Sequence, residues 1–394
     1  MKKSIFTITA AMILSVVLLT ACDKTSDSPS APTEAPASTD VPSGNTPTEA
    51  PGTSDGTPAE ASGETAAEPE YGPDGIAFAD GKLTERFTLK LVRPTQFNDA
   101  IFADLEGFYD EVGLDIEYID SLPQNVSLAQ AVQSGIVDVF GSGHTTNIVL
   151  ARQAGVNLKI VNAGTEDSAN FDQTHMTWFV QEDSPIQSAA DLKGKVIAIS
   201  GLGGCAELWT YVLLAQNGLA AEDIEITVIT PETAIEQALR QGNIDAAILH
   251  GPNNVVADNT GGLRVIAKSY DIAAGEGNGA LSAVGVRAFT EEFIAEHPAV
   301  VKAYVTAANR AQVWANANYE AALADSAEFL DLEPELIAGC PYTKSLWVEE
   351  ERLQFWIDAA EKYSFPGFET PGAVNVKDLY TNDYNPFYLG ELTE

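Results

Sequence analysis

The feature that most constrains this fold is an alternation, after residue 86, of short apolar runs with amphipathic helical patterns. Short apolar runs of this kind are typical of strands, and apolar residues spaced three and four apart are typical of helices. Strands separated by helices predict a mainly parallel sheet that helices cover on both faces. We expect strands at 87–93, 114–119, 137–140, 158–163, 196–199, 224–229, 246–249 and 263–267. We expect helices between them at 99–112, 127–133, 145–154, 206–217 and 233–241.

The pattern restarts near residue 196, which predicts two α/β units in one chain. A glycine cluster at 275–279 precedes a further expected strand at 280–287, and only helices follow, at 290–297, 298–316, 319–330 and 348–362. Helices without strands need a surface to pack on, and we expect the first unit to provide it. The sequence therefore predicts lobe 1 from 76–180 and 280–394, and lobe 2 from 181–279. The chain would cross between the lobes near Val180 and Leu281.

The first 75 residues differ from the rest in composition. Two lysines and an apolar run from Ile5 to Leu19 form a secretory-signal pattern over residues 1–21, with a plain membrane anchor as the alternative. Nine of the 20 prolines lie between Pro29 and Pro73, and 23–74 holds eleven acidic residues against one lysine. Such a segment buries too little apolar surface to offset chain entropy, so 22–75 is predicted to be a disordered tether.

The tetrad Leu19-Thr20-Ala21-Cys22 resembles the lipobox of bacterial lipoproteins. This resemblance implies cleavage before Cys22, acylation of its thiol, and anchoring to the outer face of the cell membrane.

Charge and cysteine content exclude several classes of protein. The net charge of -36 argues against nucleic acid and anionic lipid surfaces as partners, because both are bound mainly through clustered positive charge. Three cysteines are too few for a small disulfide-stapled scaffold.

Several segments of the body resemble the substrate-binding proteins of ABC transporters, in the branch for nitrate, sulfonates, taurine and thiamine-precursor pyrimidines. They occur in that family's order: EGFYDEVGLD at 106–115, QAVQSGIVD at 130–138, DSPI at 183–186, DLKGKV at 191–196, ALRQGNIDAA at 238–247 and EHPAVVKA at 296–303. The resemblance implies a two-lobed type II periplasmic-binding-protein fold with two crossing hinge strands and a helical C-terminal region. It also implies a monomer that closes on a small solute and delivers it to the permease, without cofactor, metal or catalysis.

Candidate ligand-binding residues follow from strand ends, because ligands of open α/β sheets bind where loops and helix N-termini converge. Neither glycine-containing loop completes a nucleotide-binding fingerprint. The candidates are Gln96, Phe97, Asn98, Ser142, Gly143, His144, Thr145, His175, Gly203, Gly204, Cys205, Glu207, His250 and Asn253.

The second-lobe loop departs from the family pattern in two ways. Cys205 stands where a hydroxyl residue is expected, and Glu207 would oppose an anion at the positive end of a helix. Arg93 is the only arginine beside a candidate loop. A sulfonate-like zwitterion or a pyrimidine-like ring is therefore expected rather than a simple oxyanion, and Phe97, Trp178 and Trp209 are candidates to stack on such a ring.

Two other functional classes stay open. His144, His175 and His250 would suit a metal-uptake receptor. Alternatively, Cys205 with His144 or His250 as base would suit an enzyme. The lipoprotein signal and the tether favour a receptor over an enzyme.

Overall fold

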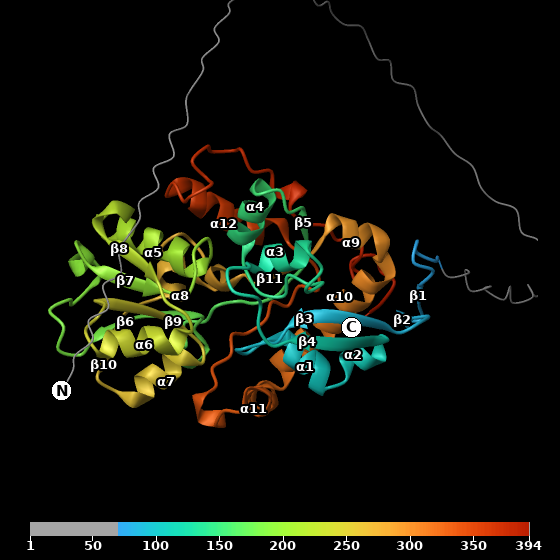
Figure 1. The fold of residues 1–394 in the computed structure, drawn as a ribbon, viewed down its shortest axis with the longest axis horizontal. Helices are drawn as coiled ribbons and strands as arrows, with labels where there is room; N and C mark the ends of the chain where they lie inside the picture. The colour runs from blue at the N-terminus through green and yellow to red at the C-terminus, as the bar shows by residue number, and fades with distance from the viewer. Residues whose placement is uncertain (1–69, 394) are drawn as a thin grey trace, which may run out of the picture. The chain divides into compact units, whose positions relative to one another are not determined.

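The computed structural model describes residues 70–393 (Figure 1). The expected signal, Cys22 and nearly all of the expected tether lie outside the described residues. The strands are β1 (Phe78–Ala79), β2 (Lys82–Leu83), β3 (Phe87–Val92), β4 (Leu114–Ile119), β5 (Leu158–Ala163), β6 (Met176–Gln181), β7 (Val196–Ile199), β8 (Glu225–Val228), β9 (Ala246–His250), β10 (Leu263–Lys268) and β11 (Val286–Thr290). The helices are α1 (Asp99–Leu105), α2 (Phe108–Glu111), α3 (Leu128–Gln133), α4 (Thr145–Gln153), α5 (Cys205–Gln216), α6 (Glu232–Arg240), α7 (Asn253–Thr260), α8 (Ser269–Ala274), α9 (Glu291–Glu296), α10 (Pro298–Ala317), α11 (Tyr319–Leu330) and α12 (Glu350–Lys362). Within 70–393, no helix is both long enough and apolar enough to cross a bilayer.

The second half of the α/β pattern forms a five-stranded sheet in the order β10-β6-β9-β7-β8. Strands β8, β7 and β9 run parallel, whereas β6 is antiparallel to both β9 and β10. Side chains alternate between two cores, because successive residues of a strand point to opposite faces: Ile197 and Ile199 lie in one core and Ala198 in the other. Helices α5 and α8 cover the first face, and α6 and α7 cover the second (Figure 1).

The first half forms smaller sheets. Strand β3 pairs in parallel with β4 from Phe87↔Leu114 to Val92↔Ile119, and β11 pairs antiparallel with β5. The strand expected at 137–140 forms only an isolated bridge from Phe140 to Ala288. The reason is local: the Asp138 carboxylate accepts the Lys90 N–H at 2.7 Å in place of a backbone carbonyl, so no continuous ladder develops.

Two further expectations are corrected. The helix expected at 99–112 divides into α1 and α2 at Gly107, whose φ of 80° breaks the helical path. The strand expected at 280–287 is wrong over its first half, since Gly279–Ala283 form the 3-10 helix η4 and the strand begins only at Val286. The Asn278 side chain caps η4 by accepting the Ala280 N–H.

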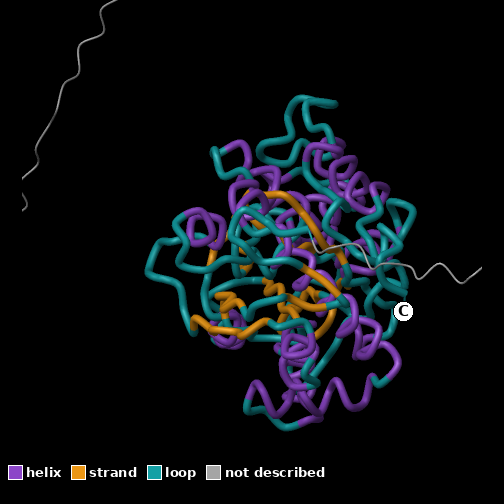
Figure 2. The backbone as a smooth tube through the Cα atoms, turned by 90° about the vertical axis from the view of Figure 1, so that its right-hand side faces the viewer, coloured by secondary structure: helices purple, strands orange, loops and turns teal. Residues whose placement is uncertain are grey.

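The C-terminal helices divide between two cores. Helix α10 packs against α1, α2 and β5, whereas α12 packs against α4, α5 and η4. One buried core therefore includes residues of β5, of the five-stranded sheet and of α12. Figure 2 shows strands toward the middle of the molecule, with helices and loops around them. The lobe boundary expected near Val180 falls within β6, which belongs to the five-stranded sheet.

Candidate functional site

A cleft of about 560 Å³ opens where the loops at the strand ends meet. Gln96, Ser142, Gly143, His144, His175, Gly204, Cys205, His250 and Asn253 line it. A smaller pocket of about 70 Å³ shares several of these residues and adds Phe97 and Asn98. Thr145, Gly203 and Glu207 line neither space.

Cys205 is placed by a tight turn at the start of α5. Gly203 has a φ of +79°, and a Cβ there would come within 2.8 Å of Leu150 Cδ1. Gly204 is the N-cap, so Cys205 is the first helical residue. The turn thus buries the thiol at the positive end of the helix dipole.

A chain of polar contacts runs from Cys205 through His250 to Glu232. Cys205 Sγ lies 3.2 Å from His250 Nε2, and His250 Nδ1 lies 2.6 Å from Glu232 Oε1. The other carboxylate oxygen, Oε2, accepts the His250 backbone N–H at 3.0 Å and the Asn253 amide N–H at 3.2 Å. Glu232 therefore fixes both the ring and the backbone of His250.

These contacts favour the charged forms of all three groups. Burial alone would raise the pKa of Cys205, but the charges of His144 and His250 lower it well below its ordinary value. Burial would likewise lower the pKa of His250, yet Glu232 and Cys205 raise it well above its usual range. Against burial, His250 lowers the pKa of Glu232 to about 2. The result is a thiolate–imidazolium–carboxylate chain.

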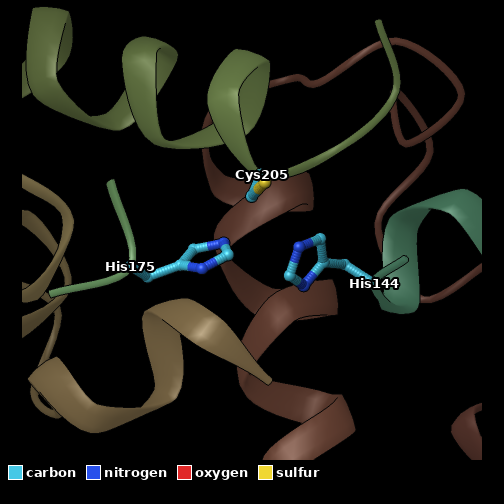
Figure 3. A group of neighbouring side chains, drawn as sticks. All are labelled: His144, His175 and Cys205. Atoms are coloured by element: carbon cyan, nitrogen blue, oxygen red, sulfur yellow. The ribbon is translucent and has the colours of Figure 1, made fainter. Parts of the chain in front are cut away.

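The other two histidines complete the cluster in different ways. His144 precedes α4, its Nδ1 lies 2.9 Å from the Val284 carbonyl oxygen, and its ring stacks on Trp356 at 4.5 Å. His175 precedes β6, and its ring lies between the other two, at centroid distances of 5.3 Å from His144 and 4.9 Å from His250. Burial lowers the pKa of His175, which favours its neutral form. Figure 3 shows the rings of His144 and His175 on either side of Cys205.

The cluster has the donor types of a metal centre. One ligand atom each from His144, His175 and Cys205 lie within 4.8 Å of one another. Imidazole nitrogen and thiolate sulfur are ligands that Zn²⁺ and related ions prefer.

Several candidates serve the scaffold instead of the cleft. Glu207 Oε2 accepts the Gly203 N–H at 2.6 Å, so its carboxylate fixes the glycine turn. Thr145 is fully buried. The Phe97 ring packs on Phe102 at 4.8 Å, while Trp178 and Trp209 are buried in the core and do not line the cleft.

Sequence reasoning missed four residues that line the site or hold its side chains in place. Glu232 follows a strand end and could have been found by the rule that found the others. Asp167, Arg287 and Trp356 carry no comparable signal, because they lie on the segment between β5 and β6, on strand β11 and on helix α12, far from the candidate loops in the sequence. Arg287 lines the smaller pocket, although its guanidinium is paired with Asp99 Oδ1 at 2.7 Å.

Comparisons with known proteins agree with this fold. A family model described as NMT1/THI5 like matches residues 95–322, more than half of the chain. A putative aliphatic sulfonates-binding protein of Escherichia coli (strain K12) is 32% identical over 150 residues, 38% of this chain and 44% of that protein. The chain thus matches less than half the length of that relative. The riboflavin-binding protein RibY of Chloroflexus aurantiacus is 27% identical over 264 residues, covering 66% of this chain and 69% of that protein.

A solved structure supports the architecture. The alkanesulfonate-binding protein SsuA from Xanthomonas axonopodis pv. citri, bound to MOPS, superposes with a TM-score of 0.60 at 20% identity, over 76% of this chain and 99% of that one. The two-lobed α/β fold of periplasmic binding proteins expected from the sequence is therefore confirmed.

Proposed function

The chain belongs to the NMT1/THI5-like family, and from this premise we propose that it is the extracytoplasmic solute-binding lipoprotein of an ABC importer. It would capture a small organic solute between two lobes and pass it to the transmembrane subunits of the permease. The proteins that it resembles are named as binding proteins for sulfonates and riboflavin, which supports a solute-binding role. The monomeric state and lipid attachment at Cys22 are parts of the same proposal.

The observation that carries the proposal is the polar cleft between the two sets of strands. Gln96, Ser142 and His144 approach from the β3 and β11 side, and Cys205, His250 and Asn253 approach from the five-stranded sheet. Polar groups that converge from two sides on a concave space are typical of ligand sites in two-lobed proteins. Closure would remove water and allow a solute to bond to both sides at once.

We place the lobe crossings at 164–175 and 275–285. These segments are bonded to each other, since Gly164 N donates to Gly285 O at 3.2 Å and Asp167 N donates to Ala280 O at 2.8 Å. Short paired crossings allow rotation of one lobe against the other with few backbone changes. The proposed first lobe is then 76–163 with 286–394, and the second is 176–274.

The charges along the cleft favour a zwitterion or a neutral ring as the solute. Cys205 and Glu232 place negative charge on the second side, with His250 between them. Arg287, whose side chain lines the smaller pocket, is already paired with Asp99. A taurine-like or pyrimidine-like solute therefore fits better than a bare oxyanion.

A thermal-shift panel tests this function on the purified chain. Taurine, an alkanesulfonate, riboflavin and a thiamine-precursor pyrimidine are each added in excess. A ligand at about 100 times its Kd stabilises the folded state by about 2.7 kcal/mol, so a cognate solute raises Tm measurably. Asn253→Ala should reduce the shift, and Asn243→Ala, on an exposed turn away from the cleft, should not. No shift with any solute would contradict the organic ligand class.

An enzyme is the second candidate, because the Cys205–His250–Glu232 chain has the geometry of an activated nucleophile. Its test is turnover: consumption of a bound compound that stops in Cys205→Ala would replace the receptor with an enzyme. Saturable binding of a compound that is released chemically unchanged supports the receptor.

A further inference from the structure

Three side chains of the cleft, His144, His175 and Cys205, hold metal-ligating atoms close together, and a fourth, His250, contacts the same sulfur. His144 precedes α4, His175 precedes β6, Cys205 begins α5 and His250 ends β9. The ligand atoms of the first three lie within 4.8 Å of one another, and His250 Nε2 lies 3.2 Å from the same sulfur. A tetrahedral ion with bonds of about 2.0–2.3 Å holds its ligand atoms about 3.3–3.8 Å apart. The spread of up to 4.8 Å among the three ligand atoms exceeds that of a coordination sphere, so the side chains would draw together around an ion.

Two of the imidazoles are already oriented by bonds on their far side. The Val284 carbonyl oxygen lies 2.9 Å from His144 Nδ1, and Glu232 Oε1 lies 2.6 Å from His250 Nδ1. Since neither partner can donate, both Nδ1 atoms carry protons. In His144 this leaves Nε2 as the free ring nitrogen. In His250 the nitrogen that faces Cys205 is Nε2, whose proton an ion would displace on binding. Such outer hydrogen bonds are typical of histidines that bind metals.

The third imidazole has an unused nitrogen. His175 Nε2 is buried and has no hydrogen-bond partner among residues 70–393. Its backbone N–H is held by Asp167 Oδ1 at 2.7 Å, which fixes the position of the residue. A buried polar atom without a partner is costly, and a bound ion would satisfy it.

We propose that the cleft binds one divalent transition-metal ion of the zinc class through His144, His175, Cys205 and His250. The three nitrogens and one sulfur exclude Ca²⁺ and Mg²⁺ as the preferred ions, because those prefer oxygen ligands. Glu232 and the Val284 carbonyl act as positioning groups. The rest of the cleft, with Gln96 and Asn253 on its wall, leaves room for an organic ligand beside the ion.

The site would also link the proposed lobes. His144 comes from one side, Cys205 and His250 from the five-stranded sheet, and His175 from the end of a crossing segment. An ion held by all four would therefore favour the closed form. The metal site lies in the proposed solute cleft, but metal binding there does not depend on a permease.

Cobalt titration of the chelator-stripped full chain tests the site. One equivalent of Co²⁺ should produce a thiolate-to-cobalt charge-transfer band, which one equivalent of Zn²⁺ should remove. The band should be lost in Cys205→Ser and kept in Cys340→Ser, the matched control at the other free thiol in the described part of the chain. A band that persists in Cys205→Ser overturns the proposal.

The histidines and their positioning groups are tested by zinc affinity. Glu232→Gln should weaken zinc binding about 10–100-fold, and His144→Gln and His175→Gln should each weaken it at least as much. His297→Gln, which is paired with Asp74 away from the cleft, should leave the affinity unchanged. Equal Tm values of the metal-free variants exclude misfolding as the cause.

A measurement on the unaltered chain covers the case in which Cys205→Ser does not fold. Zinc should slow alkylation of Cys205, mapped by peptide mass spectrometry, and Ca²⁺ should not. Unchanged alkylation at saturating zinc, or no saturable zinc binding, overturns the site. If the chain binds zinc but none of the organic solutes, the metal site is supported and the proposed organic solute is contradicted. If it binds an organic solute but no zinc, the proposed function is supported and the metal site is contradicted.

Discussion

At the scale of single residues, the cleft depends on buried groups that never line it. Asp167 lies on the proposed crossing segment 164–175, is 3% exposed, and accepts hydrogen bonds from two backbone N–H groups and three hydroxyls. The hydroxyls belong to Thr174, Ser269 and Ser282, the last at 2.5 Å. One carboxylate thus ties His175 to the second crossing segment and to α8.

Asp167→Ala should lower the free energy of unfolding by about 2–5 kcal/mol, because it leaves several buried donors without a partner. Urea unfolding measures the effect. The control is Asp172→Ala, since Asp172 is exposed in the same crossing segment and should cost less than about 0.5 kcal/mol. Equal stability of the two variants would contradict this role for Asp167.

Candidate residues could be predicted from the sequence only where local pattern decides their position. Cys205 lies in the loop region after β7 and His250 is the last residue of β9, and the carboxyl ends of parallel strands meet at one edge. Ser142 follows only the isolated bridge at Phe140. Glu207 was expected to line the cleft, but its carboxylate accepts the Gly203 N–H instead. The sequence does not show that this N–H turns toward Glu207. Trp356 reaches His144 across more than 200 residues of sequence, a contact that no periodicity encodes.

At the scale of elements, prediction succeeded where hydrophobic pattern and turn signals agree. The expected bounds of β4, β5 and β7 are those observed. Strand β6 was missed although all its residues but the last are buried, because its position between β10 and β9 depends on antiparallel pairing across the sheet. The expected strand at 280–287 failed because side-chain capping by Asn278 competes with extended backbone.

Helix α12 packs against α4 and α5, and it is bonded to the proposed crossing segment 275–285. Trp356 Nε1 donates to the Leu281 carbonyl at 2.7 Å, and Trp209 Nε1, from α5, donates to the Ser282 carbonyl at 2.9 Å. With His144 Nδ1 at the Val284 carbonyl, three ring nitrogens thus bond to three carbonyls within 281–284.

The end of α12 is joined to the segment after α8 by a pH-sensitive contact. Lys362 Nζ and the Tyr363 hydroxyl donate to the Glu276 carboxylate at 2.5 and 2.6 Å. Burial alone would raise the pKa of Glu276, but these bonds outweigh it and lower the pKa below its ordinary value. A carboxyl with a lowered folded-state pKa adds stability above its unfolded pKa of about 4.3, and that stability is lost as the pH falls further.

Glu276→Gln should therefore lower Tm at pH 7, by the equivalent of about 1 kcal/mol or less because Lys362 is exposed to solvent. The difference from the unaltered chain should shrink as the pH falls through 4, which melting curves from pH 7 to pH 3 would show. A difference that is constant over this range would show that the ionised carboxylate contributes nothing. Glu333→Gln, on an exposed turn, serves as the control.

At the scale of the whole molecule, the sequence carries many more acidic than basic residues. The excess of acidic residues continues into the folded part, so the cleft lies in a negative molecule, a setting that favours cations and zwitterions over free anions. The fold class could be predicted because strand–helix alternation and family segments agree over the length that the family model matches. The proposed lobe crossings could not be predicted from the sequence, because they depend on which sheet β6 joins.

The central claim is that the cleft closes on a ligand, and one distance tests it most directly. Thr95 and Leu202 are exposed, line the cleft, and come from the loops after β3 and β7. Fluorophores placed at these two positions through non-canonical amino acids report the distance across the cleft by single-molecule energy transfer. The account predicts a saturable shift to shorter distance with the ligand that raises Tm. A ligand that binds and raises Tm while the distance stays unchanged would contradict it.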